Sequence, residues 1–268
     1  MTTVLAAIDA KPSAKPVLAT AVTIATLFDA TAVALHVREN GTTAAEKAAS
    51  AAGLELRLLS GRPVDQIIDA AQRPEVAALV LGARARGGPE PAGHTALEVV
   101  TRVPKPVVVV PPHARPPAQL TRILVPLNGS SESSRALETT IELAHRRELE
   151  ILVLHIHTPA TVPAFADHEP HATTAWNREF LTRHIATPHE RVRLLRHLGV
   201  AADDIAAVAH EATADMIVLA WSQRLDQGRA RVVSEALGRS SIPVLLLPVS
   251  AADRRSTRSR SAPYISAR

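Results

Sequence analysis

The sequence of 268 residues contains no cysteine, and only 2% of its residues are aromatic. It therefore has no disulfide framework and no thiol chemistry, and its cores must be built from Ala, Val, Leu and Ile. No apolar run approaches the roughly 18 residues that a membrane-spanning helix needs. The first residues, MTTVLAAIDA, lack the basic and apolar regions of a signal peptide. These absences predict a cytoplasmic protein with no membrane segment.

The charge is modest, with a formal net value of +4, and much of the basic excess lies in the last residues. No basic stripe with interleaved aromatic residues precedes them, so we expect no nucleic-acid partner. Residues 251–268 are rich in Arg and Ser and have almost no apolar periodicity, which predicts a disordered basic tail. A docking tail for an acidic partner is the alternative.

The stretch from Val76 to Pro112 has the clearest pattern in the chain. Two apolar runs, Ala78–Leu81 and Val107–Val110, enclose a Gly-rich loop and a helix over Thr95–Arg102. Such apolar runs indicate strands buried on both faces of a parallel sheet. A Gly-rich turn between a strand and a helix can present backbone N–H groups to a phosphate.

The same order of strands and helices occurs twice. The first copy opens with the strand Val4–Ile8, followed by Asp9, and the second opens with Ile123–Leu127, followed by Asn128. A Pro-rich linker separates them, and the repeat predicts two α/β domains, over residues 1–113 and 119–250. The other predicted elements are the strands Ala32–Val37, Leu54–Leu59, Glu150–Ile156, Glu190–Arg196 and Val244–Leu247 and the helices Lys15–Phe28, Thr43–Ala52, Val64–Ala71, Ser134–His145, Ala175–Ile185 and Ala202–Glu211.

These motifs, in this order and spacing, resemble the universal stress protein family in its tandem form. In the first copy the resemblance is carried by AAIDA, ALHV, GRPVDQIIDAA, LVLGARARGG and PKPVVVVPP, and in the second by ILVPLNGSSESSRALE, LVLHIH, DMIVLAWS and IPVLLLP. It covers nearly all of residues 1–250. The resemblance implies two doubly wound domains like the adenine nucleotide alpha hydrolases, each a five-stranded parallel sheet of order 3-2-1-4-5. Ligands in such a sheet bind where the strand order reverses.

Nucleotide-binding members of the family carry Gly-x2-Gly-x9-Gly-Ser/Thr after the fourth strand, and this chain keeps only part of that motif. Gly82 holds the first position, Ala85 replaces the second glycine, and the loop is one residue short. His94 and Thr95 take the last two positions, and the His94 side chain is expected to obstruct a phosphate. The second copy departs further, with Ala220, Gln223, Arg231 and Val232 at the four positions.

The resemblance therefore implies weak binding of an adenine nucleotide such as ATP in the first domain only, with no metal other than the Mg²⁺ that accompanies ATP. The second domain is expected to be a structural partner. The site residues that follow from the resemblance and from the loop are Asp9, Val37, Gly82, Arg84, Gly87 and Thr95.

Several of these residues have a second interpretation. Asp9 suits a ribose or base contact, but it equally suits hydrogen bonds to the following turn. Arg84 could face phosphate oxygens or lie in a solvated loop. His155 and His157 share one face of a strand and could chelate a metal, but no third ligand is identifiable and a structural role is favoured. Trp221 is expected to fill a vacant pocket rather than to stack on a base.

We therefore expect a non-catalytic protein with a stress-response or regulatory role. A slow ATPase and a protein-interaction module without a ligand are the alternatives. The fifth strands, Val107–Val110 and Val244–Leu247, are apolar throughout, although each would end its own sheet. An open apolar edge invites aggregation, so we predict that the two strands pair within the chain. A homodimer is the other assembly considered.

Overall fold

The structure is a computed structural model. It describes residues 2–38, 41–83, 93–112, 114–116, 118–145, 147–158, 170–185, 190–224 and 229–249. Two of the predicted site residues, Arg84 and Gly87, lie outside the described residues, as does the predicted tail.

Strands and helices alternate along the whole chain. The first half comprises β1 (Thr3–Ala7), α1 (Ala14–Leu27), β2 (Thr31–Arg38), α2 (Thr43–Ala51), β3 (Glu55–Ser60), α3 (Pro63–Gln72), β4 (Val76–Gly82), α4 (His94–Arg102) and β5 (Val107–Val110). The second half comprises β6 (Arg122–Pro126), α5 (Ser131–Ala144), β7 (Glu150–His157), α6 (Pro170–His184), β8 (Val192–Leu198), α7 (Ala201–Glu211), β9 (Met216–Trp221), α8 (Arg229–Arg239) and β10 (Val244–Pro248).

All of these strands belong to one sheet, in the order β3-β2-β1-β4-β5-β10-β9-β6-β7-β8. Each half has the predicted parallel order 3-2-1-4-5. The halves meet at β5 and β10, which pair antiparallel with Val109 opposite Val244 and Val107 opposite Leu246. The predicted pairing of the two fifth strands is thus confirmed, and it joins the halves into one sheet of ten strands.

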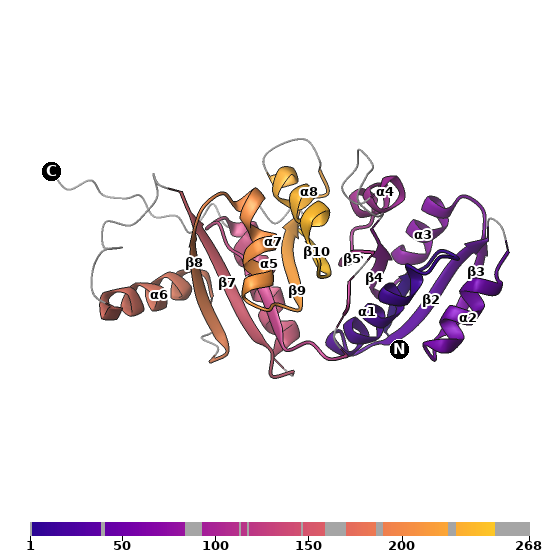
Figure 1. Cartoon of the computed structure of the whole chain (residues 1–268), viewed down its shortest axis with the longest axis horizontal. Coiled ribbons are helices and arrows are strands. Elements are labelled where there is room, and N and C mark those ends of the chain that lie inside the picture. The colour runs from indigo at the N-terminus through magenta and orange to yellow at the C-terminus, as the bar shows by residue number, and fades with distance from the viewer. Residues whose placement is uncertain are drawn as a thin grey trace.

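Helices cover both faces of this sheet. On one face α3, α4, α7 and α8 pack over a core that runs across both halves, from Ile67 and Val99 to Val208 and Leu237. On the other face α1, α2 and α5 cover a second core. Figure 1 shows α4 and α8 on either side of the junction between β5 and β10, and it shows α6 at the outer end of the second half. None of the helices in the described part of the chain has the length and apolar character that crossing a membrane requires.

Two helices begin three or more residues earlier than the sequence predicts, and both starts have a local cause. α5 begins at Ser131 rather than Ser134, because the Ser130 side chain caps it by accepting a hydrogen bond from the Ser133 N–H. α6 begins at Pro170 rather than Ala175, and proline suits the first position of a helix because that position needs no N–H donor.

Candidate functional site

A cavity of about 730 Å³ lies at the carboxyl ends of β1 and β4 in the first half. These two strands are neighbours, and the chain order reverses between them. Open α/β sheets bind their ligands at this place. Asp9, Val37, Gly82 and Thr95 all line this first-half cavity, so the fold brings together the four predicted site residues that are described.

One wall of the first-half cavity is apolar. It is formed by buried side chains from the sheet, Val37 and Leu81, and from the helices above it, Ile67 of α3 and Val99 of α4. Pro63, at the start of α3, completes this wall. The wall provides the apolar surface that a flat heteroaromatic ring would need.

Another part of the lining is polar and is built on the turn after β1. Asp9 Oδ1 accepts hydrogen bonds from the Lys11 N–H at 3.1 Å and from Ser13 Oγ at 3.2 Å. The Asp9 side chain is 51% exposed, and the ammonium of Lys11 lies 4.0 Å from its second oxygen. Asp9 therefore has the turn-stabilising role that the sequence allows, while its carboxylate still lines the cavity. Asn128 makes the equivalent turn in the second half, without the charge.

The N-terminal turn of α4 forms the third side of the cavity. Gly93 precedes it with φ of 80°, and His94, Thr95 and Ala96 line the cavity. The first turn has no acidic residue, and its N–H groups, which have no acceptor within the helix, and the positive end of the helix dipole favour an anion. His94 Nε2 lies 3.5 Å from Glu98 Oε2, and the imidazole is 72% exposed. The predicted obstruction of a phosphate by His94 stays a prediction.

Gly82 lies where β4 packs closely on α1. A Cβ atom added at Gly82 would lie 3.3 Å from Val17 Cγ2, which is tighter than an ordinary contact. Val17 itself lines the cavity, as do Lys11 and Ser13. The sequence analysis missed these three residues. Their position in the sequence could have identified them, because they follow β1, which ends where the strand order reverses.

Histidines at equivalent positions of β2 and β7, His36 and His155, have structural partners. His36 Nδ1 lies 3.0 Å from the Ile8 carbonyl, and His155 Nδ1 lies 2.8 Å from the Leu127 carbonyl, so each histidine fixes the end of the neighbouring first strand. Burial lowers the pKa of His184, and His155 and Arg183 lower it further. Within the described ranges no three His, Asp or Glu side chains are grouped so that they could hold a metal ion.

Trp221 and Gln223 donate hydrogen bonds to the other half of the molecule. Trp221 is buried, and its Nε1–H donates to the Val100 carbonyl of α4 at 2.9 Å. Gln223 Nε2 donates to the Val103 carbonyl at 2.8 Å. Trp221 therefore fills space, as predicted, but it does so against a helix of the first half.

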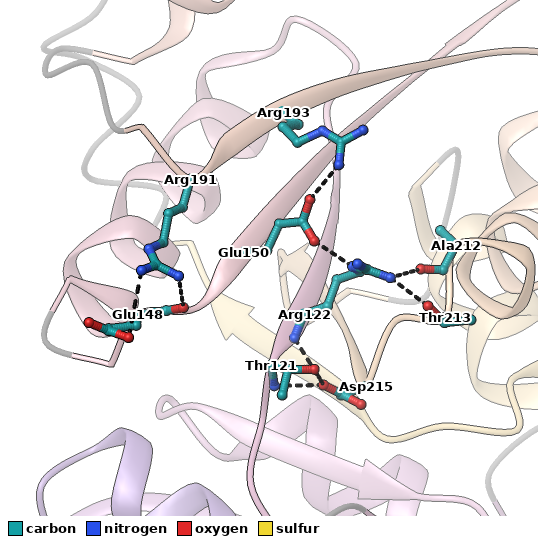
Figure 2. A network of polar contacts seen from close by, with 9 residues as sticks. All are labelled: Thr121, Arg122, Glu148, Glu150, Arg191, Arg193, Ala212, Thr213 and Asp215. Atoms are coloured by element: carbon teal, nitrogen blue, oxygen red, sulfur yellow. Dashed lines mark hydrogen bonds and ion pairs between the residues drawn. The ribbon is translucent and has the colours of Figure 1, made fainter.

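A separate polar network lies at the amino ends of β6, β7 and β8 (Figure 2). Arg122 donates to Glu150 at 2.6 Å and to the Ala212 carbonyl at 2.7 Å. Asp215 accepts from the N–H groups of Thr121 and Arg122 at 2.7 and 2.9 Å. The network lies opposite to the carboxyl ends of the strands of the second half, and it closes the turn between α7 and β9, so we assign it a structural role.

Comparison with known proteins connects this fold to one family. A model of the universal stress protein family matches residues 38–111 and 119–248. A universal stress protein from Archaeoglobus fulgidus DSM 4304 is 17% identical, with a TM-score of 0.62, over 93% of this chain and 97% of that one. A protein of unknown function from Pseudomonas aeruginosa PAO1 is 14% identical, with a TM-score of 0.66, over 97% and 98%.

A universal stress protein that was solved in complex with cAMP also matches, at 21% identity and a TM-score of 0.39, over 49% of this chain and 98% of that one. No curated protein matches the chain in sequence. The segments matched by the family model make up more than half of the 268 residues. The chain therefore belongs to the universal stress protein family.

Proposed function

We propose that this chain is a non-catalytic stress-response or regulatory protein that binds an adenine nucleotide in the first-half cavity, with Mg²⁺ accompanying ATP. The observation that carries this proposal is the convergence of Asp9, Val37, Gly82 and Thr95 on one cavity where the strand order reverses. The second half is proposed to be a structural partner. We keep the predicted domain limits, 1–113 and 119–250, as part of the proposal.

Each part of a nucleotide has a chemical counterpart in the cavity. The apolar wall with Val37 and Leu81 suits the base, and the Asp9 carboxylate suits a ribose hydroxyl. The N-terminal turn of α4 and the Thr95 hydroxyl suit the phosphates, because both donate hydrogen bonds to an anion. Lys11 adds a positive charge near the same opening. Arg84 and Gly87 are proposed to contribute from the loop before α4.

Titration calorimetry with ATP and Mg²⁺ tests this proposal. We expect a micromolar or weaker Kd, equivalent to no more than about 8 kcal/mol. Gly82→Val should abolish binding, because its side chain is forced against Val17 at the cavity wall. Thr95→Val, which keeps the size of the side chain but removes its hydroxyl, should weaken binding.

Ala220→Val is the matched control, because Ala220 occupies the position of Gly82 in the second half. It should leave ATP binding unchanged. Nanomolar binding, or binding lost only in Ala220→Val, would overturn the assignment to the first half. No heat with any of the four proteins would favour a protein-interaction module without a ligand.

A further inference from the structure

The two ends of α4 contact different halves of the molecule. Its N-terminal residues His94 and Thr95 line the first-half cavity. Its last carbonyls accept hydrogen bonds from Trp221 and Gln223 of the second half. The helix has nine residues and is about 14 Å long. Hydrogen bonds from turn to turn join the two ends of so short a helix, so a contact at one end constrains the position of the other.

The contact with Trp221 replaces a hydrogen bond that α4 cannot make by itself. The Val100 carbonyl would normally accept from the backbone N–H of residue 104, four positions along. That residue is Pro104, which has no N–H. The Trp221 indole N–H supplies the missing donor at 2.9 Å in a buried environment. Without it, the Val100 carbonyl would be a buried polar group that lacks a partner.

Gln223 Nε2 donates to the carbonyl of Val103, the residue that follows α4, at 2.8 Å. Its backbone has φ of 59°, in the left-handed region that residues other than glycine rarely adopt. Backbone of this kind persists only where the surrounding contacts hold it. The bond across to the first half is such a contact.

The internal repeat shows that these features are specific to one side of the molecule. Strand register aligns Trp221 with Ala83, a small residue that leaves the first-half cavity open. The position of Pro104 is taken in the second half by Ser241, which retains its N–H. The first half has therefore lost a donor at the end of α4, and the second half has gained one that reaches it. These two departures from the repeat complement each other.

We propose that Trp221 and Gln223 are positioning residues for the first-half cavity. From the second half they hold the C-terminal end of α4, and thereby fix where its N-terminal turn meets a bound nucleotide. This inference rests on the proposed function. It gives the second half a role in binding although that half has lost most of the glycine motif.

Amide hydrogen exchange and ATP titration, performed on the full chain, test this inference together. Trp221→Phe keeps most of the buried ring but removes the N–H donor, and Gln223→Ala is a milder variant that should fold. We expect the amides of α4 to exchange faster in both variants without any ligand. The Kd for ATP should rise on the order of fivefold in both.

Arg122→Met is the matched control, because Arg122 donates to the Ala212 carbonyl at the end of α7, a helix that does not line the cavity. It should loosen α7 and leave both α4 exchange and ATP affinity unchanged. Unchanged α4 exchange in Trp221→Phe and Gln223→Ala would overturn the inference, whether or not ATP binds. Faster exchange with an unchanged Kd would also overturn it. A wild-type chain that binds no ATP would instead refute the proposed function, and α4 exchange alone would then decide the holding role.

Discussion

Glu150 lies in a setting that favours its ionised form. Hydrogen bonds from Arg122 and Arg193, at 2.6 and 2.8 Å, lower the pKa of its carboxyl below the ordinary value, although partial burial acts in the opposite direction (Figure 2). A carboxylate whose pKa is lower in the folded state stabilises the fold above its unfolded pKa. That stabilisation is lost as the pH falls through the lowered pKa.

Glu150→Gln should therefore destabilise the chain by about 2 kcal/mol at pH 7, because both arginines lose a charged partner. The difference in free energy of unfolding between wild type and variant should shrink as the pH falls below about 4. Urea unfolding at pH 7 and at pH 3.5 measures both values.

Glu148→Gln provides the comparison for that experiment. Glu148 also pairs with an arginine, Arg191, but its side chain is 84% exposed. Exposed ion pairs contribute little, so this variant should differ from wild type by less than about 1 kcal/mol at either pH. If both variants lost the same free energy of unfolding, the network around Arg122 would stabilise the fold no more than an exposed ion pair does.

Among single residues, positions that depend on neighbours in sequence could be predicted. Asp9, Gly82 and Thr95 stand at fixed distances from strand and helix ends, and the fold brings them to one cavity. The contacts of Trp221 could not be predicted in the same way. They depend on the missing N–H of Pro104 and on the packing of the two halves, which no local pattern encodes.

At the scale of elements, the repeat extends to the polar surfaces of the helices. Arg102 of α4 lies 3.3 Å from Asp65 of α3 and 3.1 Å from Glu98 of its own helix. Arg239 of α8 lies 3.4 Å from Asp203 of α7 and 2.7 Å from Glu235. Glu98 and Arg102 stand at the same positions of α4 as Glu235 and Arg239 of α8, and in both halves these residues tie neighbouring helices together.

Helix starts were the least predictable feature of the elements, and α5 shows why. Four serines follow β6, and periodicity alone does not identify which one caps the helix. The structure assigns the cap to Ser130, which accepts from the Ser133 N–H at 3.2 Å. Ser130→Ala should cost about 1 kcal/mol of stability, measured by thermal or urea unfolding.

Ser131→Ala is the control for the cap, since Ser131 is the first residue of α5 and bonds only to the neighbouring Glu132 side chain among the contacts described. We expect a change of less than about 0.5 kcal/mol for this exposed position. If Ser131→Ala were the more damaging variant, the helix would begin elsewhere than the structure indicates.

At the scale of the whole molecule, the antiparallel junction of β5 and β10 turns two parallel sheets into one. The sequence predicted this junction because two strands that are apolar throughout could not both remain open edges. It could not predict that the halves would also share a continuous core across α4 and α8, since this depends on how the sheets align. The remaining edges are β3 and β8, which carry exposed charged residues such as Glu55 and Arg193.

A proline at Val109 tests the junction. The N–H groups of Leu79 and Ala83 donate to the carbonyls of Pro106 and Val110, so the even-numbered residues of β5 face β4. The N–H of Val109 must then face β10, opposite Val244. Val109→Pro removes that donor from the middle of a buried sheet and should cost about 3 kcal/mol, with a lower thermal midpoint and loss of solubility.

Arg196→Pro is the control, because it places the same residue in β8 at the edge of the sheet. The Gly199 N–H donates to the His157 carbonyl, and the Ile151 N–H donates to the Arg191 carbonyl. The odd-numbered residues of β8 therefore face β7, and the N–H of Arg196 points away from the sheet, where a proline is tolerated. Arg196→Pro should lower the free energy of unfolding much less than Val109→Pro does.

Equal losses of stability in the two variants would mean that proline disturbs every strand of this sheet to the same extent. Wild-type stability in Val109→Pro would mean that the halves are held together by α4 and its partners rather than by the strands.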